Sequence, residues 1–143
     1  PRAVTRLVVD ASVAVKWLVP EIHADAARRI LSPNNELLAP DLIWAEVGNV
    51  IWKKWRCGEV PGHAAGDLLQ DFRRYPVQTF ASRALMSAAW DLAERYSRSF
   101  YDSLYLALAA SSECPLVTAD LKLYNRLKTS PFAENLVWIE NIP

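Results

Sequence analysis

Four acidic residues of this chain interrupt stretches that are otherwise apolar. Asp10 and Asp120 each follow a short apolar run that is typical of a buried strand, and Glu46 and Asp102 lie inside two apolar helical segments. A lone buried carboxylate is costly unless it is paired or binds a metal ion. Arg98 precedes Asp102 by one helical turn, but it falls in a polar segment, so we expect no basic partner for either helical acid. Each acid alone is also explained as a helix cap or a solvated side chain. The hypothesis that they bind a metal ion therefore depends on the set of four.

Four carboxylates without a cysteine or histidine partner favour a particular metal chemistry. If the acids converge, their mutual repulsion raises their pKa values, and a divalent cation removes that cost. A set of ligands made of oxygen alone suits magnesium or manganese rather than zinc. Such a site is typical of metal-assisted phosphodiester hydrolysis. Ser12, Asn49 and Thr118 would orient the carboxylates by hydrogen bonding.

The segments that carry these acids alternate between strand and helix patterns. We expect a strand at the apolar runs 7–9, 36–39, 77–80, 115–118 and 136–139. Helical patterns fill residues 13–18, 21–31, 42–56, 61–75, 83–96, 100–110 and 121–128. Ser12, Asp41 and Ser82 are expected to cap helices, and Pro40 to end a strand. This alternation predicts a parallel sheet with helices on both faces, whose carboxyl edge is where ligands bind.

The composition is that of one globular domain. The chain has 143 residues, of which 52% are hydrophobic, and 16 basic residues balance 16 acidic ones. We therefore expect one domain over residues 1–143. Any contact with nucleic acid would need local basic groups, for which Lys16, Lys53, Lys54 and Arg56 are candidates, although a solvated helix end explains them equally well. With no signal peptide and no membrane-length apolar stretch, we expect a cytoplasmic protein.

Four segments, in order, resemble PIN-domain nucleases and specifically the VapC toxins of toxin–antitoxin pairs. They are residues 7–12 (LVVDAS), 41–53 (DLIWAEVGNVIWK) with 56–60 (RCGEV), 99–109 (SFYDSLYLALA) and 115–123 (PLVTADLKL). The resemblance implies an endoribonuclease that depends on Mg²⁺ or Mn²⁺ and hydrolyses RNA with metal-bound water. The family's catalytic and metal-binding acids correspond here to Asp10, Glu46, Asp102 and Asp120.

The resemblance also implies a fold and partners. The fold is a three-layer α/β/α arrangement around a parallel sheet with strand order 3-2-1-4-5. The partners are a homodimeric copy and an inhibitory VapB-like antitoxin that covers the acidic groove. Many relatives carry a further acid soon after the last aspartate, whereas Lys122, Tyr124 and Asn125 follow here, which leaves the number of bound metal ions open.

Other functions remain open at this point. One is a non-catalytic PIN-like module that binds RNA or protein, and another is a nuclease that acts on DNA. A third is a phospho-accepting receiver domain, which would need paired acids after the first strand and a lysine after the last. This chain has the single acid Asp10 at the first position and no such lysine.

Overall fold

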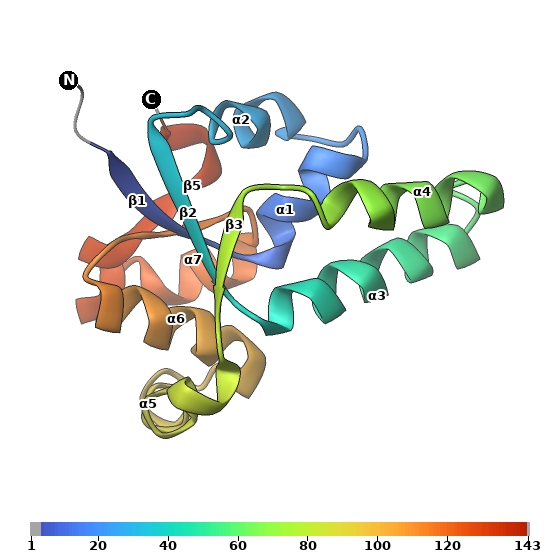
Figure 1. Cartoon of the computed structure of the whole chain (residues 1–143). Helices are drawn as coiled ribbons and strands as arrows, with labels where there is room; N and C mark the ends of the chain where they lie inside the picture. Colours follow the sequence, from blue (N-terminus) through green and yellow to red (C-terminus); the bar gives the residue numbers. More distant parts are fainter. Residues whose placement is uncertain (1–3, 143) are drawn as a thin grey trace.

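The computed structural model describes residues 4–142, so both ends of the expected domain 1–143 lie outside the described residues (Figure 1). Five parallel strands form one sheet in the order β3-β2-β1-β4-β5. The strands are β1 (Thr5–Val9), β2 (Asn35–Pro40), β3 (Val77–Phe80), β4 (Leu116–Thr118) and β5 (Leu136–Trp138). The predicted α/β class, the parallel sheet and the 3-2-1-4-5 order are therefore confirmed.

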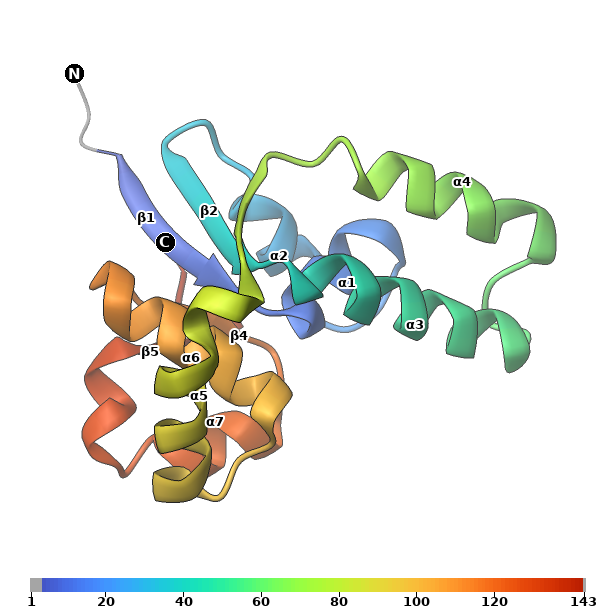
Figure 2. The same ribbon diagram turned by 60° about the horizontal axis from the view of Figure 1, so that its bottom comes forward.

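Helices cover both faces of the sheet (Figures 1 and 2). They are α1 (Ala11–Leu18), α2 (Ala24–Arg29), α3 (Leu42–Arg56), α4 (Gly62–Phe72), α5 (Ser82–Tyr96), α6 (Phe100–Ser112) and α7 (Leu121–Leu127), with short 3₁₀ helices η1 (Pro131–Asn135) and η2 (Ile139–Asn141). Connections between parallel strands are almost always right-handed. With this strand order, that rule places α1 to α4 on one face and α5 to α7 on the other.

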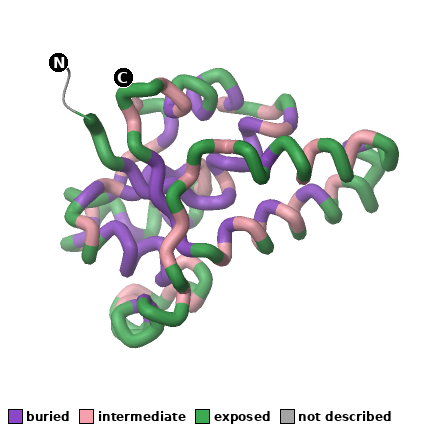
Figure 3. Tube along the Cα trace, viewed as in Figure 1, coloured by how far each residue is buried: buried purple, intermediate pink, exposed green. Residues whose placement is uncertain are grey.

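The core lies where the central strands meet α6. Val8, Val9 and Leu116 are fully buried, and α6 is buried along residues 103–109. Figure 3 shows the buried residues concentrated at this centre, whereas α3 and α4 extend away from it and contain many exposed residues. Within residues 4–142, no helix is both long and apolar enough to cross a membrane.

Several local predictions about element boundaries and helix caps were wrong. Ser82 is the first residue of α5 rather than its cap, because Ala81 occupies the N-cap position, and α4 ends at Phe72 rather than at residue 75. Strand β2 runs through Pro40, which pairs in register with Phe80 at the strand's last position, where a missing N–H interrupts little of the ladder. Helix α2 starts at Ala24 rather than at residue 21, because His23 adopts a left-handed conformation with φ of 66°. Asp41 does not cap α3 through its side chain; its Oδ1 accepts hydrogen bonds from the backbone N–H and hydroxyl of Ser82 instead.

Candidate active site

Asp10 occupies the N-cap of α1, directly after β1. Its side chain is only 7% exposed. Oδ1 accepts hydrogen bonds from the Val13 backbone N–H at 3.2 Å and from the Ser12 hydroxyl at 2.5 Å, and Oδ2 accepts one from Thr118 Oγ1 at 2.5 Å. The expectation that Ser12 caps this helix was therefore wrong, because Asp10 makes the capping bond. The carboxylate is held in a fixed orientation at the carboxyl end of the central strand.

The two hydroxyls beside Asp10 also tie down the chain after β4. Ser12 Oγ accepts a hydrogen bond from the Ala119 N–H at 3.0 Å, and Thr118 Oγ1 accepts one from the Asp120 N–H at 3.0 Å. Asp120 is the N-cap of α7, where its Oδ1 accepts from two backbone N–H groups of the first turn. The second acid is thus positioned by the same polar network as the first.

Glu46 and Asp102 approach from helices on opposite faces of the sheet. Glu46 lies in the second turn of α3, and its Oε1 is buried without a hydrogen-bond partner among residues 4–142. Asp102 lies in the first turn of α6, where its N–H donates to Ser99 Oγ at 3.0 Å. Its Oδ2 accepts from Arg98 Nη2 at 2.8 Å. The expectation that no basic residue pairs with the helical acids was therefore wrong for Asp102.

The pKa values show that these acids lie within electrostatic reach of one another. Burial raises the pKa of Asp10 from 3.8 to about 6, against the opposing hydrogen bonds, and the charge of Asp120 adds to the rise. Burial also raises the pKa of Glu46, and the charge of Asp102 adds to it. The acids therefore form two interacting pairs, Asp10 with Asp120 and Glu46 with Asp102.

Tyr105 connects the two pairs of acids. Its hydroxyl is buried without a hydrogen-bond partner in the described part of the chain, yet it lies near enough to Glu46 to lower the pKa of that carboxyl. Burial, Glu46, Asp10 and Asp102 together raise the pKa of Tyr105 far above its usual range, so the phenol stays protonated. Sequence reasoning missed this residue, although its position three residues after Asp102 places both on one face of α6.

The four acids do not form a closed cage of metal ligands. No group of three or more Asp, Glu, His or Cys side chains within residues 4–142 is arranged to hold a metal ion. Asp102 is engaged by Arg98, and both Asp10 oxygens are engaged by hydroxyls. The structure thus gathers the predicted acids as two interacting pairs along one edge of the sheet rather than at a single ligating point.

The predicted RNA-contacting residues fall into two groups. Lys16 is buried, with its Nζ 3.0 Å from Glu21 Oε1. Lys54 lies 3.1 Å from the other oxygen of Glu21 and 3.2 Å from Glu59. These two lysines are therefore paired with acidic residues within the fold. Lys53 and Arg56, the other two candidates, are exposed on α3. Asn49, which was expected to orient a carboxylate, is also exposed on this helix.

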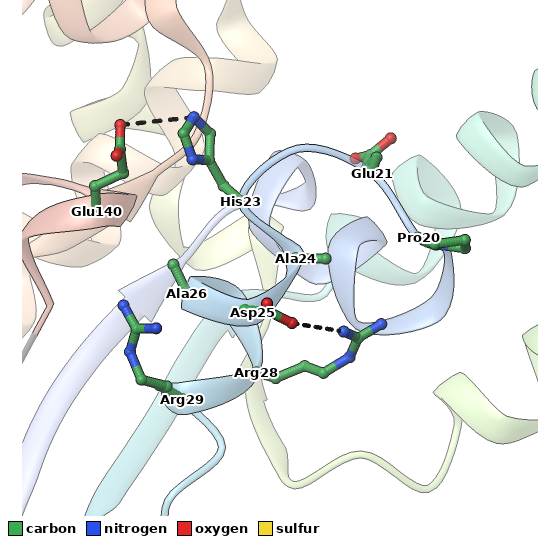
Figure 4. A pocket seen from close by; sticks show the side chains of 9 residues that line it. All are labelled: Pro20, Glu21, His23, Ala24, Asp25, Ala26, Arg28, Arg29 and Glu140. Carbon is green, nitrogen blue, oxygen red and sulfur yellow. Dashed lines mark hydrogen bonds and ion pairs between the residues drawn. The ribbon is translucent and has the colours of Figure 1, made fainter.

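A hollow of about 460 Å³ lies apart from the acids, between α2 and η2 (Figure 4). Figure 4 shows the His23 ring directed at Glu140, whose Oε1 is 3.6 Å from His23 Nε2. Arg28 pairs with Asp25 across 3.4 Å. Because its charged lining mixes both signs and none of the four acids contributes to it, this hollow is not the candidate active site.

The sequence comparison decides the family. Residues 7–128 match the PIN domain family model. The chain belongs to the PIN-domain family. Ribonuclease VapC3 of Pyrobaculum aerophilum is 34% identical over 122 residues, which cover 82% of this chain and 92% of that protein. Ribonuclease VapC9 of Mycobacterium tuberculosis is 34% identical over 120 residues, covering 82% and 87%. Within the family, the chain therefore belongs with the VapC ribonuclease toxins.

Solved structures agree with this PIN fold. The crystal structure of PAE2754 from Pyrobaculum aerophilum superposes with a TM-score of 0.69 at 26% identity, covering 95% of this chain and 85% of that one. A toxin–antitoxin complex from Klebsiella pneumoniae matches with a TM-score of 0.63 at 14% identity, covering 95% and 99%. The second likeness concerns the fold alone.

Proposed function

We propose that this PIN-domain protein is a divalent-metal-dependent endoribonuclease and the toxin of a toxin–antitoxin pair. The observation that carries the proposal is the placement of Asp10 and Asp120 at the ends of the adjacent strands β1 and β4. The sheet order reverses its direction between these strands, which is where open α/β sheets bind their ligands. The names of the VapC ribonucleases support the same activity.

The donor chemistry of the side chains at this edge suits a hard divalent cation, although the described residues do not bring three acids together as metal ligands. All four acids offer oxygen ligands, which suit Mg²⁺ or Mn²⁺. Glu46 Oε1 is buried without a partner in the described chain, and buried polar atoms are rarely left unsatisfied. The raised pKa of Asp10 reflects a carboxylate that is costly to ionise there, a cost that a cation would offset. We infer that Asp10, Glu46, Asp102 and Asp120 hold the metal.

The protein's own groups would then have distinct tasks. A bound divalent cation supplies a Lewis acid that neutralises phosphate charge and lowers the pKa of a coordinated water. Ser12 and Thr118 keep the Asp10 carboxylate in one orientation, and Ser12 with the Ala119 N–H keeps the two strand ends together. The raised pKa of Glu46 would suit its carboxylate, through the oxygen that does not hold the metal, to accept a proton from a water molecule. The exposed Lys53 and Arg56 would attract RNA phosphates.

Partners follow from the same proposal. One solved structure with this fold is a toxin–antitoxin complex from Klebsiella pneumoniae, and another is VapBC2 from Rickettsia felis bound to a DNA fragment from their promoter. These complexes support an antitoxin partner here. Large exposed apolar side chains supply surfaces for such an antitoxin and for a second copy of the chain. They include Trp52, Trp55, Met86, Trp90 and Tyr101.

The alternatives are less well supported. A receiver domain would have the strand order 2-1-3-4-5, whereas this sheet runs 3-2-1-4-5. That interpretation was therefore wrong. A non-catalytic PIN-like module would not need all four acids at the ligand-binding edge, so we favour the enzyme.

Cleavage of a structured-RNA pool tests the proposal. Purified protein, free of antitoxin, would be assayed with Mg²⁺, with Mn²⁺ and with chelator, beside the variants Asp10→Asn and Asp102→Asn. Asp91→Asn, which changes an exposed acid of α5, is the matched control. We expect cleavage that needs both the metal and the two active-site acids but tolerates the control. Wild-type cleavage rates in Asp10→Asn, or full activity in chelator, would contradict the assignment.

A further inference from the structure

Arg98 is held over the first turn of α6 by the short segment that joins α5 to α6. Ser97 ends α5 in a left-handed conformation with φ of 52°, and Ser99 caps α6 by accepting the Asp102 N–H. The residue between them places its Nη2 2.8 Å from Asp102 Oδ2. The side chains of Arg98 and Asp102 are 21% and 27% exposed, so the pair lies at the rim of the acidic edge.

Only one of two adjacent hydrogen-bond donors of the Arg98 guanidinium takes part in this contact. Nε and Nη2 form one edge of the planar fork, and they can bind two oxygens of a single anion side by side. Here Nη2 binds Asp102, whereas the buried Nε has no hydrogen-bond partner among residues 4–142. Once the side chain turns away from Asp102, a phosphate would offer acceptor oxygens for both donors, which makes it a better-matched partner than the single carboxylate oxygen that Arg98 now contacts.

Asp102 cannot serve Arg98 and a divalent cation equally. The salt bridge occupies Oδ2 of an acid that the proposed function assigns to the metal, and two cations that share one carboxylate repel each other. We propose that Arg98 is the counter-ion of Asp102 in the metal-free protein and becomes a ligand of an RNA phosphate when a divalent cation takes Asp102. The inference rests on the proposed function, because it needs both the metal and the RNA.

Metal titration in the absence of RNA tests the first half of this exchange. Calorimetry with Mn²⁺ would compare wild type, Arg98→Gln, Arg98→Lys and the control Arg95→Gln. Arg95 is exposed near the end of α5 and forms no ion pair with the described residues, so its loss changes net charge equally. We expect Arg98→Gln to lower the Kd for Mn²⁺ about threefold relative to Arg95→Gln, the size of a partly exposed ion pair. Arg98→Lys should remain near wild type.

Steady-state cleavage tests the second half. Loss of a bidentate phosphate contact should raise KM for RNA about tenfold in Arg98→Gln. Because lysine keeps the charge but not the fork, Arg98→Lys should raise KM by a smaller factor. The slope of log(1/KM) against log salt should fall by about one in Arg98→Gln. Thermal unfolding of each variant would show that the fold is retained.

Each outcome decides a separate point. If Arg98→Gln binds Mn²⁺ no more tightly than Arg95→Gln, competition for Asp102 is overturned. An unchanged KM in Arg98→Gln would overturn the phosphate contact. If wild type binds Mn²⁺ but cuts no RNA, the nuclease proposal fails while the titration still decides the competition. If wild type binds no divalent cation, the metal-dependent function and this inference fail together.

Discussion

The Thr118 hydroxyl donates a hydrogen bond of 2.5 Å to Asp10 Oδ2 and so joins the ends of two neighbouring strands. Thr118 Oγ1 also accepts a hydrogen bond from the Asp120 N–H at 3.0 Å. One buried hydroxyl, with no exposed surface, therefore orients an acid on each strand. Fully satisfied buried networks of this kind specify a single arrangement of their members, which is what a metal site needs from its protein ligands.

Replacing Thr118 by valine should damage stability and activity together. Valine keeps the shape but leaves Asp10 Oδ2 and the Asp120 N–H without their partner. We expect the free energy of unfolding to fall by about 1–3 kcal/mol, and RNA cleavage to fall with it because both acids lose their orientation. Urea unfolding and the cleavage assay measure the two effects. Thr118→Ser, which keeps the hydroxyl, is the control, and wild-type stability and cleavage in Thr118→Val would show that the hydroxyl does not hold the two acids.

The buried Asp10 predicts an unusual pH dependence of stability in the metal-free protein. Its pKa is about 6 in the folded chain and 3.8 as its ordinary value, so the folded state binds the proton more tightly. This group's stabilising contribution is complete below pH 3.8 and is lost as the pH rises through 6. Asp10→Asn should therefore raise the free energy of unfolding at pH 8 by up to about 3 kcal/mol, while abolishing cleavage.

Urea unfolding in chelator at pH 5 and pH 8 checks this prediction. Other titrating groups contribute to the wild-type curve, so the informative quantity is the difference between wild type and Asp10→Asn at each pH. The advantage of the asparagine variant should be larger at pH 8. A constant difference would mean that Asp10 titrates alike in the folded and unfolded chains.

The sheet was predictable because its signals are local. Runs such as Leu7–Val9 are branched and apolar, as strands buried on both faces must be, and Asp10 follows one of them at the edge where ligands bind. The strand order is not local, since it depends on crossovers between distant segments. It was inferred only from the resemblance to PIN domains.

The parts of the site that were missed depend on loop geometry. Arg98 was assigned to a polar loop, and its contact with Asp102 requires the left-handed turn at Ser97, which no glycine signals. Lys16 was a candidate phosphate contact because it was expected to lie near the acidic groove, where a basic residue could attract phosphates. Its pairing with Glu21 depends on how the chain turns after α1, and the sequence does not reveal that turn.

Lys16 and Lys53 should therefore have different roles, Lys16 in stability and Lys53 in RNA binding. Lys16→Met should lower the free energy of unfolding by about 1–2 kcal/mol, because a nearly buried ion pair is lost while Lys54 still neutralises Glu21. Its KM for RNA should stay at the wild-type value. Lys53→Gln, on the exposed side of α3, should leave stability unchanged and raise KM. Chemical unfolding and cleavage kinetics check both, and a raised KM in Lys16→Met would restore that residue as a phosphate contact.

Tyr105→Phe should separate activity from stability. The Tyr105 hydroxyl is buried without a partner in the described chain, so its removal should change the free energy of unfolding by less than about 1 kcal/mol. The same hydroxyl lowers the pKa of Glu46. Without it, the pKa of Glu46 rises further, and the acidic limb of the pH–rate profile should move to higher pH if Glu46 accepts the proton.

The control for this variant lies on the same helix. Tyr101 is 60% exposed on α6, so Tyr101→Phe removes a phenol oxygen without touching the acids. We expect its pH–rate profile to match wild type. If Tyr105→Phe also matches wild type, Glu46 is not the group that takes the proton, and its part is limited to metal binding. A shift in Tyr105→Phe alone would support proton transfer to Glu46, because the Tyr105 hydroxyl lowers the pKa of that carboxyl.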